Sequence, residues 1–105
     1  MIIIIGRAEV DPTKLEGLKP ALQAMMRATF EESGCLSYSM AIEDEGGDGR
    51  PAVIAITERW SGEGDLASHG ASAHMKTFNK AAAGAFWSLD LKIFDASNER
   101  PLKLG

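Results

Sequence analysis

The chain has 105 residues, of which 45% are hydrophobic and 25% charged, a composition typical of a soluble globular protein. This length is enough for one domain and too short for two, so we expect residues 1–105 to form a single domain. The formal net charge of −4, without a basic block, argues against a nucleic-acid-binding surface. The only cysteine, Cys35, excludes an internal disulfide and matches no zinc-finger pattern.

The first segment, "MIIIIGRAEV", is an apolar run that is too short for a secretory signal or a membrane span. No other stretch approaches membrane-spanning length, so we expect no membrane contact and, by default, a cytoplasmic location. β-Branched residues dominate residues 2–10, which we predict to be a strand.

A helix is predicted to follow this strand. Asp11 is a suitable N-cap and Pro12 a suitable first helical residue. Spacings of three and four form one apolar stripe, which consists of Leu15, Leu18, Leu22, Met25, Met26 and Phe30. Pro20 should kink the helix or remove one hydrogen bond, and the helix should end near Glu32, before Ser33-Gly34.

Residues 35–60 are predicted to form a hairpin. In residues 35–43, bulky side chains alternate with small ones, and the bulky face consists of Leu36, Tyr38, Met40 and Ile42. A charged, glycine-rich turn, "EDEGGDGRP", separates this strand from a second one, "AVIAITERW".

The second half contains a short helix over residues 63–70 and a longer one over 72–84, which ends at Gly84. A fourth strand is predicted over 86–95, with Leu89, Leu91 and Ile93 on one face. Residues 96–105 form a tail with little core of its own.

The resulting order, β-α-β-β-α-β, predicts a ferredoxin-like α+β fold, with one antiparallel sheet and helices on one face. The consecutive isoleucines at positions 2–5 point to both sides of this sheet. Because the helices can cover only one side, we expect a second copy of the chain on the other, giving a homodimer that pairs sheet against sheet.

The chain resembles the antibiotic biosynthesis monooxygenase family, which includes quinol monooxygenases of the dimeric α+β barrel type. The resemblance spans nearly the whole chain. It rests on the strand that ends at Asp11-Pro12 and on three stretches: "EESGCLSYSM" at 31–40, "ITERWSG" at 56–62 and "SAHMKTF" at 72–78.

This resemblance implies a pocket between the helices and the sheet, and oxidation of a small aromatic or quinol-type substrate by molecular oxygen without metal or flavin. A deprotonated, electron-rich substrate can pass electrons to oxygen itself. The protein then supplies an apolar cavity, a proton acceptor and a group that holds the substrate oxygen. The sequence also contains no dinucleotide fingerprint, and His69 and His74 are five residues apart, which does not place them on one helix face as metal ligands.

Two residues are candidates for catalysis. Trp60 ends a strand at the expected cavity mouth, and its indole N–H can donate one hydrogen bond, although a core tryptophan is an equal alternative. His74 follows a cap at Ser72, and a helix N-terminus favours its neutral, basic form; the alternative is a histidine that bonds locally.

Four further residues are candidates for substrate binding: Tyr38, Phe78, Asn79 and Trp87. Tyr38 could instead pack in the core, and Asn79 could be a surface amide. We expect His69 to be solvated, and Glu58 and Arg59 to take part in structural ion pairs.

Three alternative functions remain open. Haem-degrading relatives share a tryptophan after the third strand, but they use an asparagine in the first strand, where this chain has Gly6 and Arg7, and a histidine where it has Asn79. An isomerase of phosphorylated compounds would need a phosphate loop, whereas "EGGDG" is acidic. A non-enzymatic dimeric binding or stress-response protein would need the pocket but no proton acceptor.

Overall fold

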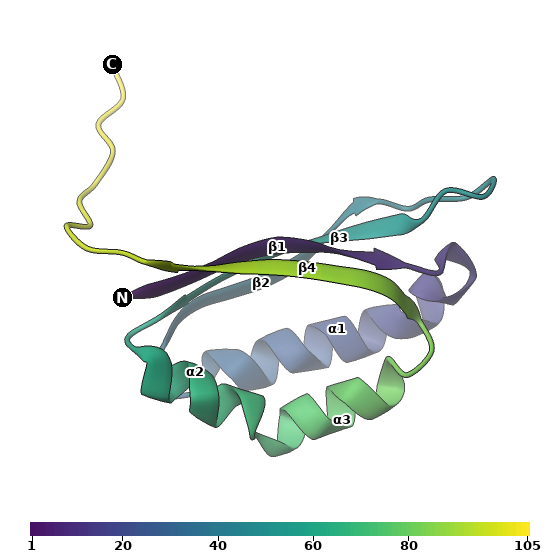
Figure 1. The fold of residues 1–105 in the computed structure, drawn as a ribbon, viewed down its shortest axis with the longest axis horizontal. Coiled ribbons are helices and arrows are strands. Elements are labelled where there is room, and N and C mark those ends of the chain that lie inside the picture. The colour runs from purple at the N-terminus through teal and green to yellow at the C-terminus, as the bar shows by residue number, and fades with distance from the viewer.

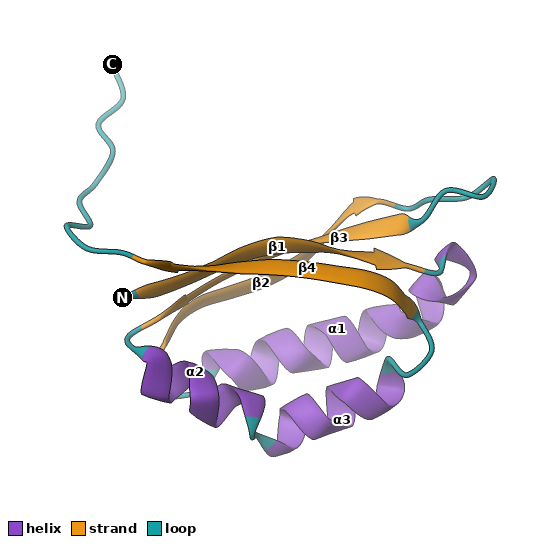
Figure 2. Ribbon diagram, viewed as in Figure 1, coloured by secondary structure: helices purple, strands orange, loops and turns teal.

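The protein is described by a computed structural model that covers residues 1–105 (Figure 1). A four-stranded antiparallel sheet lies on a layer of three α-helices (Figure 2). The elements are β1 (Ile2–Val10), a 3-10 turn η1 (Pro12–Lys14), α1 (Leu15–Phe30), β2 (Cys35–Asp44), β3 (Ala52–Trp60), α2 (Glu63–Gly70), α3 (Ala73–Ala81) and β4 (Phe86–Asp95). The strand order β2-β3-β1-β4 confirms the predicted ferredoxin-like α+β fold.

The connection from β1 to α1 follows the predicted capping pattern. The Asp11 side chain accepts a hydrogen bond of 2.9 Å from the Thr13 backbone N–H, and Pro12 opens the turn η1. The regular helix begins only at Leu15 and ends at Phe30, two residues before the predicted end at Glu32. Its apolar stripe is buried against the sheet, through Leu15, Leu18, Leu22 and Met25.

Alternation along each strand separates a helix-facing side from an open side. In β1, the even-numbered Ile2, Ile4, Ala8 and Val10 are buried, while Ile5 is 50% exposed. In β2 the alternation predicted from the sequence fails at Leu36, which is exposed. The reason is a β-bulge, because Cys35 pairs with Trp60 and Ser37 with Arg59, which leaves Leu36 without a partner.

β4 forms one edge of the sheet, next to β1. Leu89, Leu91 and Ile93 share the helix-facing side, as predicted, because they pair with Ala8, Gly6 and Ile4. They nevertheless remain 39–56% exposed, because the helical layer covers this edge only in part. The helix-facing side of β4 is therefore an apolar surface next to the core that is open to solvent.

The opposite side of the sheet has no covering element (Figure 2). Ile5 and Phe94 are each about half exposed there, beside the partly buried Ile3. The tail leaves β4 away from the helices (Figure 1), and an ion pair of 2.6 Å joins Glu99 to Arg59 of β3. None of the helices has both the length and the apolar character required to cross a membrane.

Candidate functional site

A cavity of about 290 Å³ lies between the sheet and helices α1 and α3. Ten of its twelve lining residues are hydrophobic, and the two polar ones are Glu58 and Asn79. The lining consists of Met25, Tyr38, Met40, Ile56, Glu58, Met75, Phe78, Asn79, Ala82, Phe86, Leu89 and Leu91. The cavity is thus an apolar space with a few polar groups, which is the usual character of a small-molecule site.

Glu58 is the acidic group of this cavity. It alternates along β3 with Ile56 and Trp60, so it faces the helices and is only 6% exposed. The indole N–H of Trp60 donates a 2.9 Å hydrogen bond to Glu58 Oε1. Glu58 Oε2 accepts no hydrogen bond, and since every fully buried side-chain N or O atom has a partner, this oxygen has access to the cavity.

Burial raises the pKa of Glu58 above the ordinary carboxyl value of 4.5. The hydrogen bond from Trp60 and the nearby His69 act in the opposite direction, and the charge of Glu32 adds to the increase. A carboxylate with a raised pKa and one free oxygen is suited to accept a proton from a molecule in the cavity.

Tyr38 supplies a hydrogen-bond donor at the same wall. Its hydroxyl, 3.8 Å from Met40 Sδ, donates to this weak acceptor, which a ligand oxygen could replace. Burial, together with the charges of Glu58 and Glu32, raises the pKa of Tyr38 well above its usual value, so the phenol keeps its proton. Asn79 is exposed and adds an amide to the lining.

Flat and flexible apolar groups form the rest of the cavity. The Phe78 and Phe86 rings meet edge to face, with centroids 6.2 Å apart and an interplanar angle of 87°. Met25, Met40 and Met75 add polarizable side chains that adapt to irregular shapes. These walls are suited to a planar aromatic molecule.

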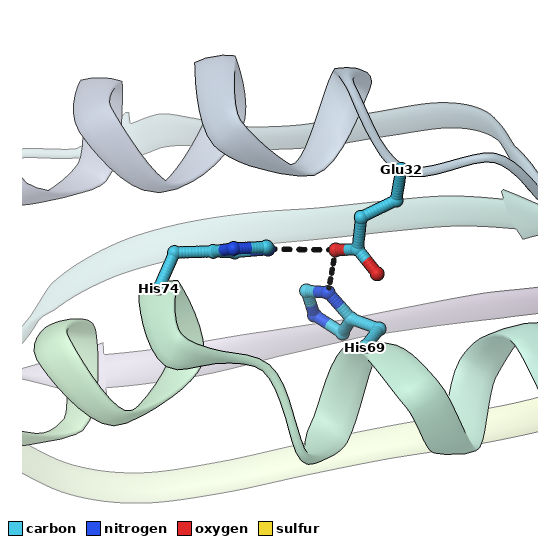
Figure 3. A group of neighbouring side chains, drawn as sticks. All are labelled: Glu32, His69 and His74. Carbon is cyan, nitrogen blue, oxygen red and sulfur yellow. Dashed lines mark hydrogen bonds and ion pairs between the residues drawn. The ribbon is translucent and has the colours of Figure 1, made fainter.

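A second group of side chains, the Glu32–His69–His74 cluster, brings two imidazoles and a carboxylate together (Figure 3). Glu32 Oε2 is 2.7 Å from His69 Nδ1 and 2.7 Å from His74 Nε2. Glu32 follows α1, while His69 lies in the last turn of α2 and His74 at the start of α3. The His69 ring centroid is 4.9 Å from that of Trp60 and 5.3 Å from that of Tyr38, so the cluster packs directly against residues of the cavity wall.

Of the six candidate residues from the sequence, three line the cavity and three lie outside its lining. Tyr38, Phe78 and Asn79 line the cavity. Trp60 is completely buried and lies behind Glu58. His74 borders a separate hollow of about 210 Å³ between α1 and α3. Trp87, 53% exposed, faces another hollow beside the turn at residues 45–49.

Two expectations from the sequence were wrong. His69 is 3% exposed rather than solvated, because the end of α2 turns it under β3 toward Trp60. Glu58 forms no ion pair; Arg59, on the opposite side of the sheet, pairs with Glu99 instead. The alternation of β3 already contained the signal for Glu58, because it places this residue on the same side as Ile56 and Trp60.

The spacing argument against a cluster of metal ligands also does not hold in the folded chain. It applied the spacing rule for one continuous helix, although the sequence itself predicts two helices, over 63–70 and 72–84. The chain breaks at Ala71 and Ser72 between α2 and α3, and both imidazoles turn toward Glu32. Glu32 lies in the stretch at 31–40 that carries the family resemblance, but the sequence gave no sign that it meets His69 and His74, which are 37 and 42 residues away.

Comparison with solved structures gives the same fold. The chain is similar to a proposed antibiotic biosynthesis monooxygenase from Deinococcus radiodurans, with 22% identity, a TM-score of 0.80, and 98% of this chain and 99% of that chain covered. A second from Nitrosomonas europaea has 21% identity, a TM-score of 0.79, and coverage of 91% and 98%. A third from Bacteroides thetaiotaomicron has 25% identity, a TM-score of 0.77, and coverage of 99% and 95%.

Comparison of the sequence with curated proteins gave no match. The sequence profile described as antibiotic biosynthesis monooxygenase, in contrast, matches residues 1–81, which include β1 to α3 and most of the cavity wall. The chain therefore belongs to the antibiotic biosynthesis monooxygenase family.

Proposed function

We propose that this protein is a monooxygenase that oxidises a small aromatic or quinol-type substrate with molecular oxygen, without metal or flavin. The observation that carries this proposal is the free oxygen of Glu58 on the wall of an apolar, aromatic-lined cavity. Such a carboxylate can take a proton from a phenolic or benzylic position, and the low polarity around it favours transfer of the resulting charge to oxygen.

Each step of the proposed reaction balances without an external reductant. Glu58 removes a proton from a substrate CH₂ or phenol group and leaves an electron-rich anion. The anion forms a C–O bond to O₂ and receives the proton back as a hydroperoxide. Loss of water then leaves a carbonyl, so that R–CH₂–R and O₂ become R–CO–R and H₂O, and all electrons come from the substrate.

Other lining residues orient the substrate in this scheme. The Tyr38 hydroxyl donates to the substrate oxygen in place of Met40 Sδ and stabilises the charge that develops there. Phe78 and Phe86 hold the ring plane, and Asn79 offers a second polar contact. In this arrangement, Trp60 positions Glu58 and does not touch the substrate.

Oxygen uptake by the purified protein with an anthrone or quinol and no added cofactor tests the proposal. Glu58→Gln keeps the shape and the acceptor for Trp60, and it should lower turnover by about 10²–10⁴-fold because the proton acceptor is lost. Glu31→Gln, at an exposed glutamate beside the Glu32 cluster, is the matched control and should leave turnover unchanged.

His74 was the proton acceptor suggested by the sequence, and it remains the rival for this role. His74→Ala should retain turnover if Glu58 is the base, because His74 lies outside the cavity lining. Lost turnover in His74→Ala beside normal turnover in Glu58→Gln would return the role to His74. If no substrate drives oxygen uptake but aromatic molecules still bind, the protein is better described as a non-enzymatic binding protein.

A further inference from the structure

We propose that Glu32, His69 and His74 form a three-ligand site for a divalent cation of the zinc class, separate from the cavity of the proposed function. The three ligand atoms all lie within 4.8 Å of one another (Figure 3). Two imidazole nitrogens and one carboxylate oxygen are a donor set that zinc favours, and three protein ligands leave one position for water.

The three ligand atoms must shift to admit the ion. Ligand atoms at about 2.0–2.2 Å from a tetrahedral zinc lie about 3.3–3.5 Å from one another. The two contacts to Glu32 Oε2 measure 2.7 Å each, so they must widen by about 0.6–0.8 Å. The two imidazole nitrogens lie within 4.8 Å of each other and must come to the same spacing. Each imidazole must also place its hydrogen on the other ring nitrogen, which frees His69 Nδ1 and His74 Nε2 to bind the ion.

The surroundings hold these ligands in place while leaving an approach for the ion. The His69 side chain is 4% exposed and is confined between Trp60 and Tyr38. The side chains of Glu32 and His74 are 17% and 25% exposed, so the cluster is reached from the His74 side. A hollow of about 70 Å³ borders Glu32 together with Asp65 and Ser68, so solvent also reaches Glu32.

The role of this ion would be to join three helices. Glu32 follows α1, and the histidines belong to α2 and α3, which are separated by the short break at Ala71 and Ser72. None of the three ligands lines the 290 Å³ cavity. The ion would therefore stabilise the helical layer without contacting a substrate in the cavity.

Titration calorimetry of the untagged, chelator-treated protein with Zn²⁺ alone tests this site. The chain contains two histidines, so histidine-dependent binding can come only from His69 and His74. We expect one ion per chain, a higher melting temperature with Zn²⁺, and visible absorption typical of four-coordinate Co²⁺ when Co²⁺ is used as the probe. Co²⁺ should also quench the fluorescence of Trp60, which is in contact with His69.

Variants locate the ion. Glu32→Gln and His74→Gln should each weaken Zn²⁺ binding by more than the 10–100-fold typical of outer-shell changes. Cys35→Ser and Glu31→Gln are controls that change nearby groups outside the cluster, and both should bind as the wild type does. If Glu32→Gln fails to fold, the Zn²⁺ affinity of His74→Gln and the Co²⁺ spectrum of the wild type still show whether the ion binds at this cluster.

The site is refuted if the wild type binds no Zn²⁺ at millimolar concentration, or if binding is the same in His74→Gln. Neither result depends on turnover, so failure here leaves the proposed oxidation untouched. Conversely, a protein without oxygen uptake that still binds one Zn²⁺ through His74 would retain this site and lose the proposed function.

Discussion

Glu58 occupies a position where function and stability act against each other. Its carboxyl lies among apolar groups and receives one hydrogen bond, from Trp60. Because its pKa is raised, the protonated form is favoured in the folded protein. The stabilising contribution is present below pH 4.5 and is lost as the pH rises through the raised value, so the ionised form at neutral pH costs stability.

The first prediction concerns pH. Turnover should fall as the pH decreases through the raised pKa of Glu58, since only the ionised form accepts a proton. Glu58→Gln should be at least as stable as the wild type at pH 7, and the difference should shrink below pH 4.5, where the wild-type carboxyl is also neutral. Denaturant unfolding at several pH values measures this. The prediction is contradicted if the stability of Glu58→Gln relative to that of the wild type is lower at pH 7 than at pH 4.

A second prediction separates the two contributions of Trp60. Trp60→Phe keeps an aromatic ring in the core but removes the N–H that bonds Glu58 Oε1. The pKa of Glu58 should rise further, and the acid limb of the pH–rate profile should move to higher pH. Trp60→Ala should in addition cost roughly 3–5 kcal/mol, because it truncates a completely buried ring. An unchanged profile in Trp60→Phe would mean that the indole N–H does not tune Glu58.

At the scale of the elements, the pairing of β1 with β4 depends on a residue without a side chain. A Cβ at Gly6 would lie 2.0 Å from the Asp90 carbonyl oxygen and 2.8 Å from Leu91 Cα. These are backbone atoms that cannot move aside individually, so any side chain would separate the two strands. β4 also carries Leu89 and Leu91 of the cavity wall, which links this position to the ligand space.

The third prediction follows from this contact. Gly6→Ala should destabilise the protein by about 1–3 kcal/mol or more, as overpacking does, and should weaken ligand binding. Gly17→Ala is the matched control, because nothing lies within 4 Å of a Cβ at this exposed position of α1. It should stabilise the helix by roughly 0.5–1 kcal/mol. Thermal unfolding measures the stability of both variants. Equal changes in the stability of Gly6→Ala and Gly17→Ala would contradict the prediction.

The elements themselves could be predicted from local signals. Asp11-Pro12 and Ser72 mark helix starts, and alternation in β1 and β3 assigns side chains to faces, because these patterns depend only on neighbours in the chain. The bulge at Leu36 escaped prediction, since it depends on how two strands pair. The Glu32 cluster escaped for a similar reason, since it depends on how three helices meet.

The candidate site was predictable in part. Tyr38, Phe78 and Asn79 belong to motifs on faces that alternation or helical periodicity points toward the cavity. Glu58 was missed because a carboxylate in a strand was interpreted as part of a structural ion pair, although its position between Ile56 and Trp60 indicated that it faces the core. The location of His74 could not be read from the sequence, because it depends on the angle between α2 and α3.

At the scale of the whole molecule, the main feature is the side of the sheet that no helix covers. Ile5 and Phe94 are half exposed on it, and the tail leaves in the same direction (Figure 1). Leu102 and Leu104 of this tail are more than 80% exposed. A second copy of the chain placed against this side would cover the apolar groups of both, which supports the homodimer expected from the sequence.

The fourth prediction tests this homodimer. Ile5→Lys should dissociate the dimer and lower its stability, because burial of an isoleucine contributes roughly 1.5–3 kcal/mol. Gln23→Lys adds the same charge to the exposed side of α1 and should leave the assembly unchanged. Light scattering at micromolar concentration measures both. A monomeric wild type would contradict the prediction.

The strict two-sidedness of β3 has a consequence for how such a protein can change. Ile56 and Glu58 line the cavity and Ile54 is buried on the same side, while Val53, Ala55 and Thr57 lie on the opposite side. Under the proposed function and the expected homodimer, neighbouring residues of this strand would therefore serve different purposes: one set would contact the ligand, and the interleaved set would contact the second copy of the chain. Substitutions at Ile56 should therefore change ligand preference while the assembly stays constant, and substitutions at Ala55 and Thr57 should do the reverse.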